Sequence, residues 1–184
     1  MDLVSLLKIV KKRLDKAGIP YMVSGGMAVS FWGFPRTTHD IDIVIEAQEK
    51  DKNKIIRLFE KDFYISDVAV EEAIKNRFTF NIIDNKSGLK IDFWLLKRDA
   101  FGKSEFQRKL KKRMFGEDIF IISPEDLILC KLIGFEETKS SRRLQDAKSI
   151  LQTSRVDMDY IKAWAERQGT TGILKELLEK NKNY

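Results

Sequence analysis

Residues 23–46 read VSGGMAVSFWGFPRTTHDIDIVIE, and this stretch decides the fold. A short apolar segment runs into the pair Gly25-Gly26, a second short apolar segment follows, and acids then alternate with aliphatic residues from Asp40 to Glu46. Glycines open a turn where the backbone can approach a ligand, and alternation with a period of two is typical of a strand with two different faces. The stretch therefore predicts a strand, a turn, a short helix and a second strand with acids on one face.

The acids of this region suggest a metal site. Asp40 and Asp42 are two positions apart, so on a strand both project to the same face. A third acid, Asp92, lies in LKIDFW at 89–94, on the second strand of a predicted strand–turn–strand unit over 77–96. Three such carboxylates can hold two Mg²⁺ ions, whereas without a metal they repel one another unless Lys or Arg compensates.

Each of these signals also has a purely structural interpretation. Asp-Ile-Asp can be a strand end with two solvated acids, and the glycine pair can be a tight turn without a ligand. The context favours function, because the pair follows a strand and precedes a helix, where backbone N–H groups attract phosphate. Taken together, the two signals indicate phosphoryl or nucleotidyl chemistry.

Composition limits the class of protein. A chain of 184 residues that is 43% hydrophobic can bury the core of one domain, with room for a small helical extension. The net charge of +6 favours polyanionic partners, although solubility or growth at high temperature also accounts for it. One cysteine, no leader and no apolar run of roughly 20 residues predict a cytoplasmic protein without a membrane segment.

Apolar periodicity and capping residues predict the other elements. The chain beyond Lys97 is expected to be mostly helical, apart from a strand at 118–122. Ser123-Pro124 is a strong helix start, with Ser as cap and Pro at the first helical position. Helices are expected at 3–17, 52–61, 124–136, 142–152, 157–168 and 171–180.

Three motifs resemble those of the DNA polymerase β-type nucleotidyltransferase superfamily. They are VSGGMAV at 23–29, RTTHDIDIVI at 36–45 and KIDFW at 90–94. Within the superfamily the chain is most similar to the minimal AbiEii-like group, some of whose members are toxins of toxin–antitoxin systems. That group also has a helix with a Lys followed by a helix with an Asp, and Lys131 and Asp146 match these two residues.

The resemblance implies an α/β (α+β) fold, a mixed sheet flanked by helices, with a catalytic core at 1–122 and a helical extension at 123–184 behind a soft boundary. It also implies transfer of a nucleoside monophosphate from an NTP, with two Mg²⁺ ions and loss of pyrophosphate. The residues it assigns are Ser24, Gly25 and Gly26 for the triphosphate, Asp40, Asp42 and Asp92 for catalysis and metal binding, and Lys131 and Asp146 near the nucleotide. Arg36 is a further candidate for nucleotide binding, through contact with phosphate.

Some of these assignments have alternatives. Arg142 or Arg143 can pair with Asp146 at helical spacing, and Arg36 can simply tether its loop. The basic tract 103–113 reads either as a solvated helix face or as a footprint for an RNA backbone.

The acceptor is the most open question. RNA such as tRNA is the main expectation, with an antitoxin protein as a further partner. The alternatives are a small hydroxylated molecule of the aminoglycoside kind, a protein side chain, a nucleotide-binding module without catalysis, and a two-metal nuclease.

Overall fold

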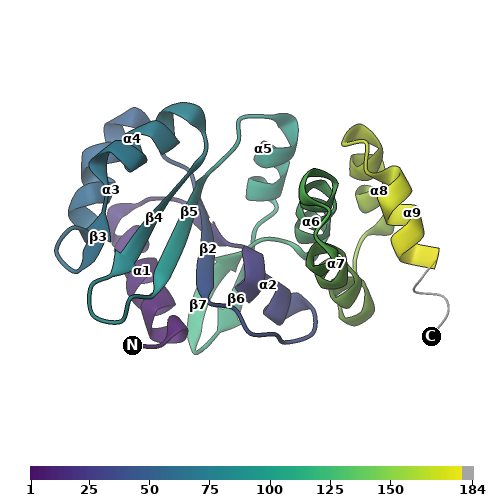
Figure 1. The fold of residues 1–184 in the computed structure, drawn as a ribbon, viewed down its shortest axis with the longest axis horizontal. Helices are drawn as coiled ribbons and strands as arrows, with labels where there is room; N and C mark the ends of the chain where they lie inside the picture. The colour runs from purple at the N-terminus through teal and green to yellow at the C-terminus, as the bar shows by residue number, and fades with distance from the viewer. Residues whose placement is uncertain (180–184) are drawn as a thin grey trace. The chain divides into compact units, whose positions relative to one another are not determined.

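The computed structural model describes residues 1–179, whose strands form one seven-stranded mixed sheet (Figure 1). The order across the sheet is β3-β4-β5-β2-β1-β7-β6. β2 with β5 and β1 with β7 are parallel pairs, and the other neighbours are antiparallel. The strands are β1 Tyr21–Val23, β2 Asp40–Ile45, β3 Phe63–Ile65, β4 Thr79–Asp84, β5 Lys90–Leu95, β6 Leu110–Met114 and β7 Glu117–Ile121. The predicted mixed sheet flanked by helices is confirmed.

The helices begin and end at residues suited to those positions. The Asp2 side chain caps α1 by accepting from the Ser5 backbone N–H at 2.7 Å, and Gly18 ends it with a φ of 63°. Ser123 caps α6 and Pro124 is its first residue, as predicted. The helices are α1 Leu3–Ala17, α2 Gly25–Trp32, α3 Lys52–Phe59, α4 Asp67–Asn76, α5 Ala100–Gln107, α6 Pro124–Thr138, α7 Ser141–Thr153, α8 Met158–Arg167 and α9 Thr171–Glu179.

The chain divides into two compact units. The first contains residues 1–27 and 37–121 and holds the sheet with α1, α3, α4 and α5. The second contains residues 28–36 and the chain from 122 onward, and it holds α6 to α9. The domain boundary at 122/123 stays a prediction.

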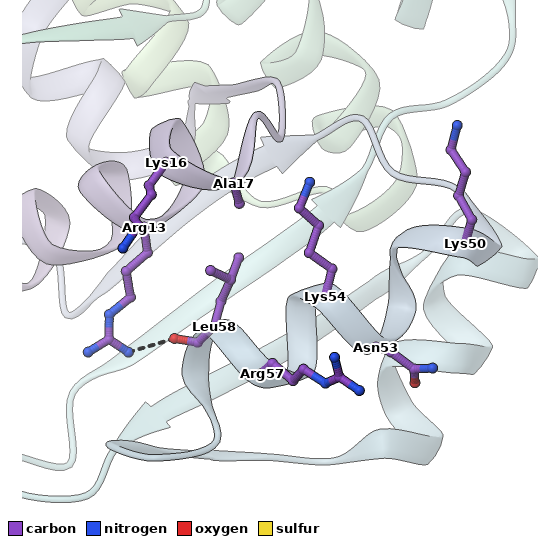
Figure 2. Close-up of a pocket in the computed structure, with 8 residues that line it drawn as sticks. All are labelled: Arg13, Lys16, Ala17, Lys50, Asn53, Lys54, Arg57 and Leu58. Carbon is purple, nitrogen blue, oxygen red and sulfur yellow. Dashed lines mark hydrogen bonds between the residues drawn. The ribbon is translucent and has the colours of Figure 1, made fainter.

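The two faces of β2 and β5 differ in the first unit, as the alternation predicted. Ile41, Ile43 and Phe93 are fully buried on one face, and the Phe59 ring of α3 packs 5.6 Å from that of Phe93. The neighbouring α1 is joined to α3 by a hydrogen bond from Arg13 Nη1 to the Leu58 carbonyl (2.8 Å; Figure 2). Helices therefore cover the apolar face, and the acids lie on the opposite face.

The expectation of mostly helical structure after Lys97 is wrong for Leu110–Met114, which forms β6 and pairs with β7. β6 lies at the edge of the sheet and has three consecutive basic residues, so it lacks the apolar alternation that marks a strand. The last predicted helix is present to Glu179, and its predicted end at Lys180 lies outside the described residues. Within residues 1–179, none of the helices has the length and apolar character needed to cross a membrane.

Candidate active site

The register between β2 and β5 brings the predicted acids together. Asp42 is the partner of Asp92 and Asp40 is the partner of Lys90 across this parallel pair. All four are partly buried on the face opposite the one on which α3 packs. Neighbouring strands lie about 4.8 Å apart, so the three acids are close neighbours on one surface.

Lys90 supplies the positive charge that three neighbouring acids require. Its Nζ lies 2.8 Å from Asp92 Oδ2. The pKa of Lys90 is raised, first by the hydrogen bond to Asp92 and further by the charges of Asp92, Asp40 and Asp42, against the opposing effect of burial. The condition that a Lys or Arg compensates the acids is therefore met by a residue of β5 itself.

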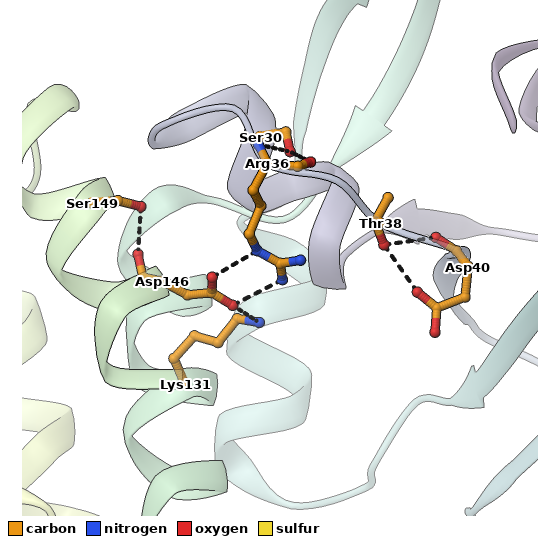
Figure 3. Close-up of polar contacts among 7 residues, drawn as sticks. All are labelled: Ser30, Arg36, Thr38, Asp40, Lys131, Asp146 and Ser149. Carbon is orange, nitrogen blue, oxygen red and sulfur yellow. Dashed lines mark hydrogen bonds and ion pairs between the residues drawn. The ribbon is translucent and has the colours of Figure 1, made fainter. Parts of the chain in front are cut away.

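The other two acids also have partners. Trp94 Nε1 donates to Asp42 Oδ1 at 3.0 Å. Figure 3 shows the second contact, in which Thr38 Oγ1 donates to Asp40 Oδ1 at 3.0 Å. Trp94 follows Asp92 by two positions and so lies on the same face of β5.

The donor set fits Mg²⁺ in its chemistry. Carboxylate oxygens are the ligands this ion prefers, and the Lys90 ammonium already shows that the face attracts a cation. In the arrangement described for residues 1–179, no group of three or more His, Cys, Asp or Glu side chains is set to hold a metal ion. Lys90 Nζ contacts one carboxylate oxygen of Asp92, so a metal ion and the Lys90 ammonium would compete for this carboxylate.

The glycine turn lies directly against the acids. Gly25 has a φ of 57°, and a Cβ placed on it would come 1.8 Å from Asp42 Oδ2. Ser24 N donates to the Asp42 carbonyl at 2.9 Å. α2 begins at Gly25, so the first backbone N–H groups of this helix, which have no partner within it, start beside Asp42. A side chain at position 25 would therefore prevent the close approach of the turn backbone to the Asp42 carboxylate.

In the second unit, Asp146 joins the two cations predicted to lie near the nucleotide. Its Oδ1 accepts from Arg36 Nε at 2.8 Å, and its Oδ2 accepts from Arg36 Nη2 at 3.0 Å and lies 2.8 Å from Lys131 Nζ (Figure 3). The Asp146 side chain is only 4% exposed. Burial acts to raise the pKa of Asp146, but the hydrogen bonds from Arg36 and Lys131 outweigh it and hold this pKa below the ordinary value.

This network bears on the structural alternatives for Arg36 and Asp146. The backbone of Arg36 is bound to Ser30, whose Oγ donates to the Arg36 carbonyl at 3.1 Å, while the Arg36 guanidinium binds Asp146. Asp146 does bind basic side chains, but these are Arg36 and, from α6, Lys131. Helical spacing made Arg143 an alternative partner for Asp146, but Arg143 lies against Gly134. A Cβ atom placed on Gly134 would come 2.0 Å from Arg143 Nη1.

The assigned residues thus form two groups. Ser24, Gly25, Gly26, Asp40, Asp42 and Asp92 belong to the first unit, and Arg36, Lys131 and Asp146 belong to the second. Their roles in binding and catalysis stay predictions. The sequence interpretation missed Lys90 and Trp94, although both are two positions from Asp92 and the period-two rule for strands identifies them as its neighbours on one face.

Three basic side chains of the tract 103–113 make contacts within the protein. Lys111 Nζ and Arg113 Nη1 each lie 3.3 Å from a carboxylate oxygen of Asp118. Burial lowers the pKa of Lys109, whose Nζ donates to the Phe106 carbonyl at 3.0 Å and lies 3.9 Å from the centre of the Phe106 ring. The residues from 110 onward form a strand, so the tract is not one helix face.

Solved structures with a similar fold include two antibiotic-modifying proteins and a nucleotidyltransferase-like protein. ANT(2'')-Ia in complex with adenylyl-2''-tobramycin aligns with a TM-score of 0.60 at 12% identity, covering 91% of this chain and 97% of that one. The lincosamide antibiotic adenylyltransferase LnuA aligns with a TM-score of 0.56 at 14% identity, covering 84% of this chain and 99% of that one. An antigenic nucleotidyltransferase-like protein from Paracoccidioides brasiliensis aligns with a TM-score of 0.52 at 16% identity, covering 81% of this chain and 73% of that one.

Sequence comparison identifies the family. A search of curated proteins finds no match, but the family model described as aminoglycoside-2''-adenylyltransferase matches residues 6–122, well over half of the chain. The matched residues include the glycine turn and all three acids of the sheet. The match does not test membership of the AbiEii-like group, which stays a prediction. The chain belongs to the aminoglycoside-2''-adenylyltransferase family and, through it, to the polymerase β-like nucleotidyltransferase superfamily.

Proposed function

We propose that this protein transfers a nucleoside monophosphate, AMP in the first instance, from an NTP to a hydroxyl group of a small molecule of the aminoglycoside kind. Family membership supports the transfer and the class of acceptor. The observation that carries the proposal is the contact of the Gly25 turn with Asp42, on the face that also holds Asp40 and Asp92. A phosphate-binding turn and a set of acids at one place are what an NTP donor requires.

In the proposed reaction the acceptor hydroxyl oxygen attacks the α-phosphorus of the NTP. A new P–O bond forms, the bond to the bridging oxygen of pyrophosphate breaks, and pyrophosphate leaves with the electron pair. Asp92 takes the hydroxyl proton, while the backbone at Ser24, Gly25 and Gly26 cradles the triphosphate. Asp40, Asp42 and Asp92 would hold Mg²⁺, which supplies charge neutralisation at the phosphates and lowers the pKa of a bound oxygen.

Arg36 and Lys131 are proposed to bind the nucleotide as a pair that Asp146 orients. Arg36 donates two hydrogen bonds to Asp146, and Lys131 has three donors, of which Asp146 takes one. Donors thus remain on Lys131 for phosphate while its stem is held in place.

RNA as acceptor, with the toxin role and antitoxin partner that go with it, is the second candidate. The net charge of +6 favours it. The pairing of Lys111 and Arg113 with Asp118 reduces the charge of the tract on which that candidate first relied.

The test is a transfer assay with each α-labelled NTP and Mg²⁺, run against a panel of aminoglycosides and against total RNA. The expected result is pyrophosphate release together with a gain of one nucleotide mass on an aminoglycoside, abolished in Asp42→Asn and retained in Asp159→Asn, a side chain that is 99% exposed. Labelling of RNA alone would select the second candidate. Full activity in Asp42→Asn would reject the assigned site.

A further inference from the structure

A cationic groove lies between α1 and α3 of the first unit (Figure 2). It has a volume of about 660 Å³. Five basic side chains line it and no acid does, and the other lining residues are Ala17, Asn53 and Leu58. The basic residues of this α1–α3 groove are Arg13, Lys16, Lys50, Lys54 and Arg57.

Only one of these cations is neutralised. Arg13 donates to the Leu58 carbonyl and forms an ion pair with Asp62. Among residues 1–179, no Asp or Glu lies within ion-pair distance of the other four, and all four are exposed. The groove therefore keeps about four units of positive charge in solvent.

The groove is separate from the acids of the sheet. α3 packs on the apolar face through the contact of Phe59 with Phe93, whereas Asp42 and Asp92 project from the opposite face. The sheet thus stands between the groove and the candidate active site, and the groove has no part in positioning a donor or a small acceptor there.

The kind of ligand follows from the lining. Sites for small molecules enclose most of the ligand, whereas four of the five cations of this groove are exposed to solvent. Exposed, flexible lysines suit a chain of repeated phosphates, because each neutralised phosphate releases counterions. The lining has no aromatic ring on which a base could stack.

We propose that the α1–α3 groove binds the phosphodiester backbone of a nucleic acid without reading its sequence. This binding is independent of the transferase reaction proposed above. It predicts affinity that falls steeply with salt, with a slope of log K against log salt of about −0.7 for each phosphate contacted, or about −3 for four cations on a single strand.

The experiment measures fluorescence anisotropy of labelled 20-nucleotide RNA and DNA single strands at 50 to 200 mM salt. The groove variant is Lys16→Gln/Lys50→Gln/Lys54→Gln. The control variant is Lys75→Gln/Lys86→Gln/Lys175→Gln, which loses the same charge at exposed lysines outside the groove. The groove variant should lose about tenfold or more in affinity at 50 mM salt, and its slope of log K against log salt should be less negative by about 2. The control variant should stay near wild type in both quantities. Circular dichroism checks that each variant is folded.

Comparable binding of RNA and DNA by the wild type, and full binding by Asp42→Asn, would support the proposal even if no transferase activity is found. The proposal is overturned if the wild type does not bind at 50 mM salt, if groove and control variants lose affinity equally, or if binding depends on base sequence. Binding to anionic lipid vesicles in place of nucleic acid would overturn it as well.

Discussion

The replacement of Asp146 by Asn tests whether its carboxylate holds the second unit together. Asn keeps the shape of the side chain and one acceptor oxygen. It loses the negative charge and presents an N–H₂ group where Oδ2 accepts from Arg36 Nη2 and contacts Lys131 Nζ. Two charge-assisted contacts are lost, and two cations face a donor.

The expected loss follows from these contacts. Hydrogen bonds to charged groups contribute about 1.5 to 3 kcal/mol each in buried settings. The side chains of Arg36 and Lys131 are 25% and 12% exposed, so water replaces part of what is lost. The lower figure for two contacts gives about 3 kcal/mol, which for a chain of this size corresponds to about 6 to 12 °C in Tm.

Urea unfolding followed by circular dichroism measures this difference, and pH provides a second check. The pKa of Asp146 in the folded protein lies below its ordinary value of about 3.9. Its contribution to stability is therefore complete above roughly pH 5 and is lost as the pH falls through the folded pKa. The free-energy gap between wild type and Asp146→Asn should shrink over the same range.

Asp159→Asn is the matched control, because its carboxylate is 99% exposed and lies 3.9 Å from Lys162. A change within about 0.5 kcal/mol is expected there. The reasoning is refuted if Asp146→Asn costs less than about 1 kcal/mol at pH 7, or if its deficit does not change down to roughly pH 2.

Three further predictions concern the acid face. Gly25→Ala should abolish transfer and destabilise the protein by about 1 to 2 kcal/mol, because Ala is strained at a φ of 57° and its Cβ meets Asp42; normal activity in this variant would contradict the contact. Lys90→Gln should lower Tm in EDTA and gain more from 10 mM Mg²⁺ than wild type does, since the acids lose their internal cation; equal gains would show that Lys90 does not compete with the ion. Trp94→Phe should remove most of the change in tryptophan fluorescence on addition of Mg²⁺ and ATP, because Trp94 donates to Asp42; an undiminished signal would assign it to another tryptophan.

Local patterns in the sequence predicted much of the first unit, but they gave no prediction for β3 at Phe63–Ile65 or α4 at Asp67–Asn76. Alternation around Asp40 and Asp42 predicted the strand and its two faces, and the glycine pair predicted the start of α2. The edge strand β6 was missed because basic residues replace the apolar ones that make a strand recognisable.

The long-range partner of Asp146 was not predictable from the sequence. Arg36 and Asp146 are 110 positions apart, and no local rule selects Arg36 over Arg143, which has the better helical spacing. Lys90 is a different case, because its place beside Asp92 follows from strand geometry alone.

The seating of Gly25 against Asp42 has a thermodynamic consequence. The turn proposed for the triphosphate and the strand proposed for the ion share a backbone hydrogen bond and a van der Waals contact, so a displacement of one displaces the other. Bound Mg²⁺ should therefore change the affinity for nucleotide by the same factor by which bound nucleotide changes the affinity for Mg²⁺, since coupling between two binding equilibria is reciprocal. Titrations of nucleotide at fixed Mg²⁺, and of Mg²⁺ at fixed nucleotide, should return one coupling constant.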